Sequence, residues 1–226
     1  MIRLEQVCMT YATRSRERSV LDGVDLIVRP GEKIGILGRN GAGKSTLIRL
    51  MSGAELPTSG EVHRGMSISW PLAFSGGFQG SLTGLDNLRF ICRVYDAPVA
   101  PVIDFVQDFS ELGEYLFEPV RKYSAGMRAR LAFAISMAID FDCFLIDEIV
   151  AVGDQRFHAR CHEELFLKRK HCAMIIVSHH PGYIREHCER AAVLVEGRLH
   201  AFDDIADAFA FYEESGRRAN EAGAAS

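Results

Sequence analysis

Long apolar runs, closely paired cysteines and an excess of positive charge are all missing from this sequence of 226 residues. The longest mainly apolar run extends from Leu131 to Ile139, whereas a membrane-spanning helix needs ~20 such residues. The N-terminal residues Met1 to Glu5 lack the basic and then apolar layout of a signal peptide. We therefore expect the chain to stay in the cytosol, and to need another subunit if it works at a membrane.

The charge balance argues against one class of partner. The chain has 26 Lys and Arg against 30 Asp and Glu, a formal net charge of −4. A protein that binds nucleic acid independently of sequence is expected to present a basic face. No nucleic-acid partner is therefore expected.

The cysteines are scattered, with no Cys-x-x-Cys pair, as is typical of reduced and mostly buried thiols in a cytosolic protein. His158, Cys161 and His162 are residue types that bind zinc, but no second cluster has a matching spacing, so a zinc site is not favoured. The six cysteines are Cys8, Cys92, Cys143, Cys161, Cys172 and Cys188.

One stretch, Gly38 to Thr46, has the layout of a phosphate-binding loop between a strand and a helix. Glycines let backbone N–H groups point into a small concave space, and Lys44 adds a mobile cation. The positive end of the helix lies under the phosphates, and the hydroxyl of Ser45 can ligate Mg²⁺. The expected ligand is a Mg²⁺-nucleoside triphosphate, and the alternative is a plain glycine turn. The predicted nucleotide-binding residues of the loop are Gly38, Asn40, Gly41, Ala42, Gly43, Lys44, Ser45 and Thr46.

The order of apolar segments indicates an α/β fold. Residues 2–8 and 24–28 alternate as strands, so an antiparallel sheet precedes the nucleotide core. Aliphatic strands then alternate with helices, which favours a mostly parallel sheet with functional groups at the carboxyl ends of its strands. The further strands are predicted at 33–37, 143–146, 173–177, 192–195 and 198–200.

The remaining segments are mostly helical. Helical spacing from 85 to 116, and again in the helix that Ser124 is placed to cap, predicts a helical subdomain at about residues 80–140. Further helices are expected over 155–168 and 205–214. Residues 1–214 then form one domain, and the polar composition of 215–226 is typical of a disordered tail.

Three arginines cluster in the polar stretch between the first two strands. Arg14, Arg16 and Arg18 fit a solvated hairpin, and the alternative is contact with lipid headgroups or phosphate.

Polar groups follow two of the apolar strands directly. Asp147 and Glu148 end one strand, and Ser178 and His179 end another. In a parallel sheet these ends meet the phosphate loop at one edge. Asp147 is expected to hold Mg²⁺ through water, Glu148 to orient and deprotonate the attacking water, and His179 to hydrogen-bond the γ-phosphate.

From Tyr11 to about Gly197 the chain resembles the nucleotide-binding subunits of ABC transporters, which are P-loop ATPases with a RecA-like core, an antiparallel β subdomain and a helical subdomain. The resemblance implies that Tyr11 stacks on adenine and that Gln79 reaches Mg²⁺ and the attacking water. It also implies that Asp154 lies at a dimer seam. Ser124, Ala125 and Gly126 resemble the signature sequence, which in that family binds the γ-phosphate held by the partner protomer.

The signature segment has its own physical rationale, because a capped helix start with small residues presents free N–H groups and a positive dipole end. Its target would be ATP on a second copy of the chain, which makes a head-to-tail homodimer. The usual signature sequence is Leu-Ser-Gly-Gly-Gln. In this chain the segment from Tyr123 to Met127 is Tyr-Ser-Ala-Gly-Met. One glycine has gained a methyl group, and the role of the glutamine is unfilled.

Three segments, 78–84, 123–127 and 149–154, look most like the polysaccharide exporters of capsule, O-antigen and teichoic acid. Because the chain stops soon after Glu214, without the added β-sandwich of some members, it resembles the capsular type. This implies an ATPase peripheral to the cytoplasmic face of the inner membrane. Its partners would be an integral membrane permease and, indirectly, a lipid-linked polysaccharide and envelope export proteins.

Three alternatives stay open. The first is a soluble ABC ATPase acting on nucleic acid or the ribosome, although such proteins usually need a long insert or two fused domains. The second is an ABC ATPase for O-antigen, teichoic acid or lipid. The third is a P-loop kinase, which would leave the capped helix start at Ser124 without a role.

Overall fold

The structure, a computed structural model, describes residues 1–12, 16–72, 77–147 and 154–224, with side chains up to Arg218. The chain forms two compact units. The first contains Met1–Ile68, Asp142–Ile149 and His171–Ser226, and the second contains Ser69–Phe141 and Val150–Lys170.

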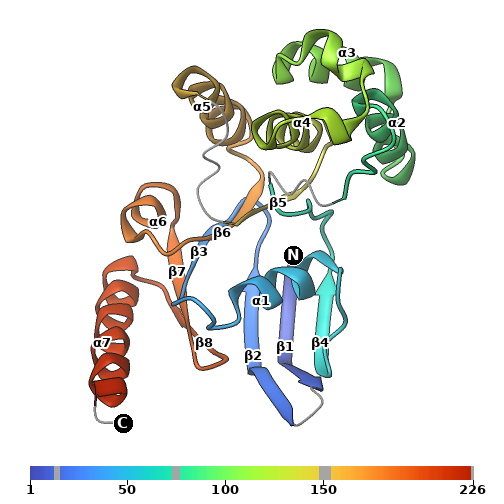
Figure 1. Cartoon of the computed structure of the whole chain (residues 1–226). Helices are drawn as coiled ribbons and strands as arrows, with labels where there is room; N and C mark the ends of the chain where they lie inside the picture. The colour runs from blue at the N-terminus through green and yellow to red at the C-terminus, as the bar shows by residue number, and fades with distance from the viewer. Residues whose placement is uncertain (13–15, 73–76, 148–153, 225–226) are drawn as a thin grey trace. The chain divides into compact units, whose positions relative to one another are not determined.

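A five-stranded sheet in the order β5-β6-β3-β7-β8 forms the centre of the first unit (Figure 1). Its first four strands are parallel and β8 runs antiparallel to β7. β6, an interior strand of the sheet, is buried at every position. The strands are β3 (Lys33–Leu37), β5 (Cys143–Asp147), β6 (Ala173–Val177), β7 (Arg190–Val195) and β8 (Arg198–Phe202).

A second, antiparallel sheet in the order β2-β1-β4 belongs to the same unit (Figure 1). It consists of β1 (Ile2–Ala12), β2 (Glu17–Val28) and β4 (Ser59–Arg64). Alternate residues of β1 and β2 are buried, and one apolar core joins both sheets with the helix α1 (Lys44–Ser52). This core fixes the start of α1 relative to the ends of the parallel strands.

The second unit is helical. α4 is fully buried from Leu131 to Met137, and α3 packs on it, with the rings of Phe109 and Phe133 5.8 Å apart. α5 continues into a π-helical turn at Glu163–Lys168. The helices of the second unit are α2 (Gly84–Val94), α3 (Val99–Ser110), α4 (Ala125–Ala138) and α5 (Gln155–His162), with short 3₁₀ turns at Gly113–Phe117 and Val120–Lys122.

The predicted α/β class, the parallel core and the preceding antiparallel sheet are confirmed. The helical part is larger than the predicted range of about 80–140, because it also takes in α5. The reason is a ring contact: Phe157 of α5 is fully buried, and its ring lies 5.5 Å from that of Phe109 in α3. Helical spacing predicts the helix itself but does not reveal which core it joins.

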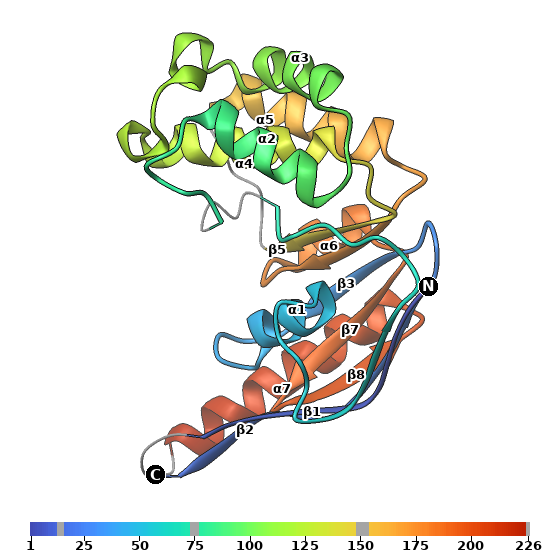
Figure 2. The same ribbon diagram turned by 90° about the vertical axis from the view of Figure 1, so that its right-hand side faces the viewer.

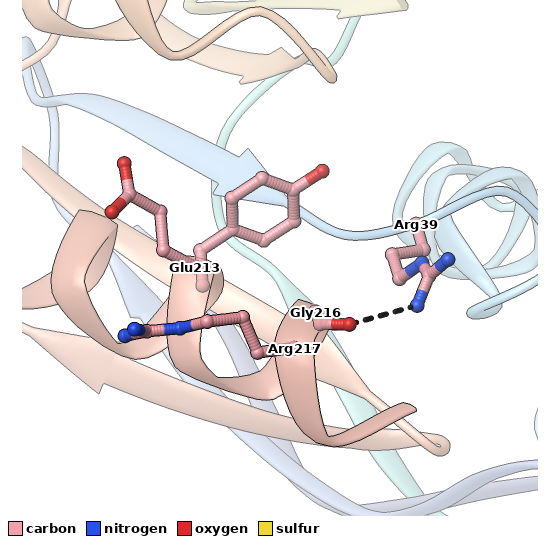
Figure 3. A pocket seen from close by; sticks show the side chains of 5 residues that line it. Arg39, Glu213, Gly216 and Arg217 are labelled. Atoms are coloured by element: carbon pink, nitrogen blue, oxygen red, sulfur yellow. Dashed lines mark hydrogen bonds between the residues drawn. The ribbon is translucent and has the colours of Figure 1, made fainter. Parts of the chain in front are cut away.

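Two helices complete the first unit, α6 (Pro181–His187) and α7 (Ile205–Ala224). α7 lies along β7 and β8 (Figure 2). It extends past the predicted end at Glu214, through most of the stretch expected to be a disordered tail. Arg39 of the phosphate loop donates to the backbone O of Gly216 at 3.3 Å (Figure 3), and Arg218 pairs with Glu214 one turn away.

None of the helices described in the structure is both long enough and apolar enough to cross a membrane.

Candidate functional site

The carboxyl ends of β3, β5 and β6 lie at one level of the sheet. Val177, the last residue of β6, is in register with Ile36 of β3 on one side and with Asp147 of β5 on the other. The predicted meeting of these strand ends beside the phosphate loop is therefore confirmed for Asp147. Glu148, the predicted base, lies outside the described residues.

A cavity of ≈ 750 Å³ opens at this edge of the first unit. It brings together Tyr11, most of the phosphate loop and Asp147, residues that are far apart in the sequence. Two further members come from β2: Arg18, for which phosphate contact was only the alternative interpretation, and Val20, which was not predicted. The lining residues are Tyr11, Arg18, Val20, Asn40, Gly41, Gly43, Lys44, Ser45, Thr46 and Asp147.

The phosphate loop needs glycine at Gly43. Its φ of 109° is strained for any residue with a side chain, and a Cβ there would lie 3.0 Å from both Val20 O and Leu21 Cδ2. The loop is closed by a hydrogen bond from Ala42 N to Arg39 O at 3.1 Å. Ala42 itself lines a neighbouring cavity of ≈ 690 Å³ on the side of α7.

Lys44 lies folded back on the loop. Its Nζ donates to Gly38 O at 2.6 Å and to Arg39 O at 3.1 Å, and the residue is only 8% exposed. Because α1 begins at Lys44, the N–H groups of its first turn, which have no partner within a helix, point toward the cavity edge. Buried cation and helix start together make a site for a polyphosphate.

Ser45 and Asp147 line the same cavity and offer a hydroxyl and a carboxylate oxygen. Hard oxygen donors of this kind suit Mg²⁺ beside phosphate groups. The residues present therefore fit the predicted metal.

Beyond β6, Ser178 is fully buried, and its N–H donates to Ile36 O at 3.2 Å. Its Oγ accepts from His180 N at 3.0 Å, which fixes the turn that carries His179. The rings of His179 and His180 lie 4.0 Å apart. Among the described residues His179 does not line the cavity. The role of Ser178 in holding the turn after β6 was not predicted from the sequence. The signal that could have indicated it is a polar residue directly after an apolar strand.

Gln79 belongs to the second unit, where its backbone is held by Asn87 of α2. Gln79 N donates to Asn87 Oδ1 at 2.8 Å, and Asn87 Nδ2 donates back to Gln79 O at 3.1 Å. Asn87 is 3% exposed. A buried amide that saturates both backbone groups of Gln79 fixes this part of the chain, and sequence spacing gave no sign of it.

The signature segment forms a capped helix start, as predicted. Ser124 Oγ accepts from Met127 N at 3.2 Å, and Ser124, Ala125 and Gly126 are exposed. A Cβ on Gly126 would meet only Ser124 Oγ, at 3.9 Å. Packing within the chain therefore does not require glycine there, which leaves the start of α4 open to a ligand.

Tyr123 replaces the usual leucine of the signature segment and serves the core instead. It is 3% exposed, and its hydroxyl donates to Tyr115 O. A Cβ on Gly84 would lie 2.4 Å from the Tyr123 hydroxyl oxygen. Burial raises the pKa of Tyr123 to about 12, so the phenol stays protonated and keeps donating.

Asp154 caps α5, since its Oδ1 accepts from Phe157 N at 2.9 Å. Its pKa lies below the ordinary value, chiefly because of this bond. Arg130 of α4 donates to Asp154 Oδ2 at 3.2 Å and to Glu111 Oε2 at 2.9 Å, and its guanidinium lies 4.4 Å from the Phe157 ring centroid. The helix that starts at the signature segment is thus tied to Asp154, a link that the sequence did not reveal.

The disfavoured zinc cluster does not form in the described part of the chain, where His158, Cys161 and His162 are not grouped as ligands. Burial raises the pKa of the Cys161 thiol to about 12.

Comparison with known proteins agrees with this geometry. The sequence pattern of the family described as ABC transporter matches residues 21–151. The ATP-binding protein BexA of Haemophilus influenzae is 59% identical over 215 residues, which cover 95% of this chain and 99% of BexA. The capsule polysaccharide export ATP-binding protein CtrD of Neisseria meningitidis serogroup B is 58% identical over 212 residues, 94% of this chain and 98% of CtrD. The polysialic acid transport ATP-binding protein KpsT of Escherichia coli is 41% identical over 217 residues, 95% of this chain and 99% of KpsT.

Solved structures share the fold. An ATP-binding cassette determined as a dimer in a post-hydrolysis state with ADP and Pi superposes with a TM-score of 0.75 at 20% identity, covering 88% of this chain and 96% of the other. An ATP-binding subunit of an ABC transporter superposes with a TM-score of 0.79 at 19% identity, covering 96% and 98%. Family pattern, full-length relatives and fold agree with the phosphate cavity, and the chain therefore belongs to the ABC transporter family, among its ATP-binding proteins.

Proposed function

We propose that this chain is the ATP-hydrolysing subunit of an ABC exporter that moves capsular polysaccharide across the inner membrane. The observation that carries the proposal is the 58% identity, over nearly the whole length of both proteins, to a relative named for capsule polysaccharide export. The cavity beside the phosphate loop supplies the chemical support, because its lining suits a nucleoside triphosphate.

Within the cavity, Lys44 and the first-turn N–H groups of α1 would bind the β- and γ-phosphates. The hydroxyl of Ser45 and the carboxylate of Asp147 would hold Mg²⁺, with Gln79 as a further ligand. Bound Mg²⁺ would offset the negative charge that develops on the phosphate oxygens. Tyr11, on the β1 side of the same cavity, would stack on the base.

Hydrolysis needs a base for water and a group that recognises the γ-phosphate. We assign proton abstraction to the carboxylate of Glu148, directly after Asp147, and a hydrogen bond to the γ-phosphate to His179. Gln79 would orient the attacking water. Lys44, already inside the loop, would neutralise charge without a large movement of its side chain.

The exposed, capped start of α4 supports a homodimer in which Ser124, Ala125 and Gly126 bind the γ-phosphate held by a second copy. Asp154 would lie at the seam between the two copies. The dimer would dock peripherally on an integral membrane permease at the cytoplasmic face of the inner membrane. The permease would carry the lipid-linked polysaccharide toward the envelope export proteins.

The test measures ATP binding, ATP hydrolysis and surface capsule for two variants of the chain produced together with the permease. Lys44→Ala should lose ATP binding, hydrolysis and surface capsule, whereas Glu148→Gln should bind ATP, hydrolyse it at least ~100-fold more slowly and accumulate as an ATP-bound dimer in gel filtration. His63→Ala, on the exposed face of β4, is the control and should match the parent. If Glu148→Gln hydrolyses ATP at the parental rate, the assigned base is wrong. A surface capsule that survives deletion of the gene would contradict the export function.

A further inference from the structure

Tyr11 lines the nucleotide cavity from β1, and its ring rests partly on the apolar core of the first unit. Its hydroxyl lies in a half-buried polar cluster formed by Arg49 and Glu55. These residues are 38 and 44 positions away in the sequence. The orientation of the ring is therefore set by contacts that no local pattern reveals.

The hydroxyl of Tyr11 is used in both directions. It donates to Glu55 Oε2 at 2.6 Å and accepts from Arg49 Nη2 at 3.0 Å. The same Arg49 nitrogen donates to Thr46 Oγ1 at 3.2 Å, and Arg49 Nε lies 3.2 Å from Glu55 Oε1. A phenol that donates to a carboxylate and accepts from a guanidinium has both of its bonds charge-assisted, and the ring loses its freedom to rotate away.

The charges of this cluster are held in place by the same bonds. The hydrogen bond that Tyr11 donates is the largest cause that lowers the pKa of Glu55, and the one that Tyr11 accepts from Arg49 is the largest that raises the pKa of Arg49. The two bonds thus favour the charged forms of both groups.

The cluster also connects two parts of the cavity. Thr46 lies in the first turn of α1 and lines the cavity, and Arg49 lies one turn further along the same helix. A single guanidinium thus joins the tyrosine of β1 to the helix that starts at the phosphate loop.

We propose that Arg49 and Glu55 are positioning residues that hold the Tyr11 ring ready for the base and link base recognition to the phosphate-binding helix. This inference rests on the proposed ATP-binding function. A ring that is already oriented loses less conformational freedom when a base stacks on it, and this favours binding.

The test compares ATP with inorganic tripolyphosphate, which has the phosphates but no base, by calorimetric titration of the full chain with Mg²⁺. Tyr11→Phe keeps the ring and removes both of its hydrogen bonds, and Glu55→Gln removes the carboxylate. Each should weaken ATP binding about fivefold to tenfold and leave tripolyphosphate binding unchanged. Glu118→Gln, which breaks an exposed ion pair with Lys122 in the other unit, is the matched control and should change neither.

A second comparison separates positioning from general stability. In a Tyr11→Ala background the Glu55→Gln change should have no further effect on ATP affinity, because there is no ring left to orient. Equal losses of ATP and tripolyphosphate affinity would overturn the proposal, since a merely structural role in seating α1 weakens both. Parental ATP affinity in Tyr11→Phe and Glu55→Gln would also overturn it. If Lys44→Ala still binds ATP as the parent does, the proposed function itself fails. If Tyr11→Phe does not fold, Glu55→Gln alone decides.

Discussion

At Gly43 the backbone conformation and the neighbouring atoms favour glycine over any residue with a side chain. Gly43→Ala should cost about 1–3 kcal/mol of unfolding free energy and should weaken ATP binding, because its Cβ would press on Val20 and Leu21 beside the cavity. The control is Gly113→Ala, whose φ of 53° is also left-handed but whose Cβ would meet no atom within 4 Å. It should cost ~1 kcal/mol and leave ATP binding intact. Urea unfolding and nucleotide titration measure both, and equal behaviour of the two variants would contradict the packing argument.

Glu32 gives the protein a pH-dependent contact. Burial alone would raise its pKa, but hydrogen bonds from the Arg190 side chain and the Arg29 N–H, together with the charges of both arginines, lower it below the ordinary value. The stabilising effect is thus present above the unfolded pKa of about 4.3 and is lost as the pH falls through the lower folded value.

We therefore expect Glu32→Gln to be less stable than the parent at pH 7 and to lose less stability between pH 5 and pH 3. Urea unfolding over that range measures the difference. Glu61→Gln, at a side chain that is 72% exposed, should follow the parent curve. If Glu32→Gln loses as much stability between pH 5 and pH 3 as the parent does, the ion pair with Arg190 does not contribute to the free energy of unfolding.

At the scale of an element, the β1–β2 hairpin carries a prediction of its own. Arg18 of β2 is in register with Tyr11 of β1 and lines the same cavity. Of the two interpretations of the arginine-rich stretch, contact with phosphate gains support at this one residue. Arg18→Gln should raise the Kd for ATP about threefold to tenfold, as expected for loss of a charge-assisted contact. Arg16, two residues before it and exposed, is not among the residues lining the cavity, so Arg16→Gln is the control. Equal Kd values for the two variants would contradict the phosphate contact and would favour the interpretation of a solvated hairpin.

Individual strands and helix starts were predictable because their signals are local. The apolar run of β6 begins and ends as predicted, and Ser124 caps α4. Contacts between distant segments were not predictable. The Tyr11 to Glu55 bond and the Arg130 to Asp154 bond depend on how strands and helices are brought together, and periodicity contains no such information. α7 extends past Glu214 despite the polar composition of this stretch, and Arg39, far away in the sequence, bonds to its backbone at Gly216.

For the molecule as a whole, the division into two units predicts an uneven response to ligand. The only tryptophan, Trp70, packs in the helical unit against Tyr95 and Phe141 at 5.4 and 5.5 Å. The described residues that line the ATP cavity all belong to the first unit. A ligand at 100 times its Kd stabilises the unit that binds it by ~2.7 kcal/mol.

A non-hydrolysable ATP analogue with Mg²⁺ should therefore slow amide hydrogen exchange in β3 and β6 more than it shifts the urea midpoint of Trp70 fluorescence. In Lys44→Ala neither signal should move. Equal stabilisation of both signals would mean that the two units unfold as one cooperative body.

The contact between Arg39 and Gly216 has a practical consequence for measurement. A fluorophore attached through Arg217→Cys would sit beside the phosphate loop without entering it, and its emission would report on the loop as nucleotide arrives. Burial raises the pKa of Cys143, Cys161 and Cys188 to about 12, which suppresses their labelling, and the half-buried Cys8 would be replaced by serine before the fluorophore is attached. A fluorophore on α7 would therefore allow the rate of ATP turnover to be measured from outside the catalytic pocket.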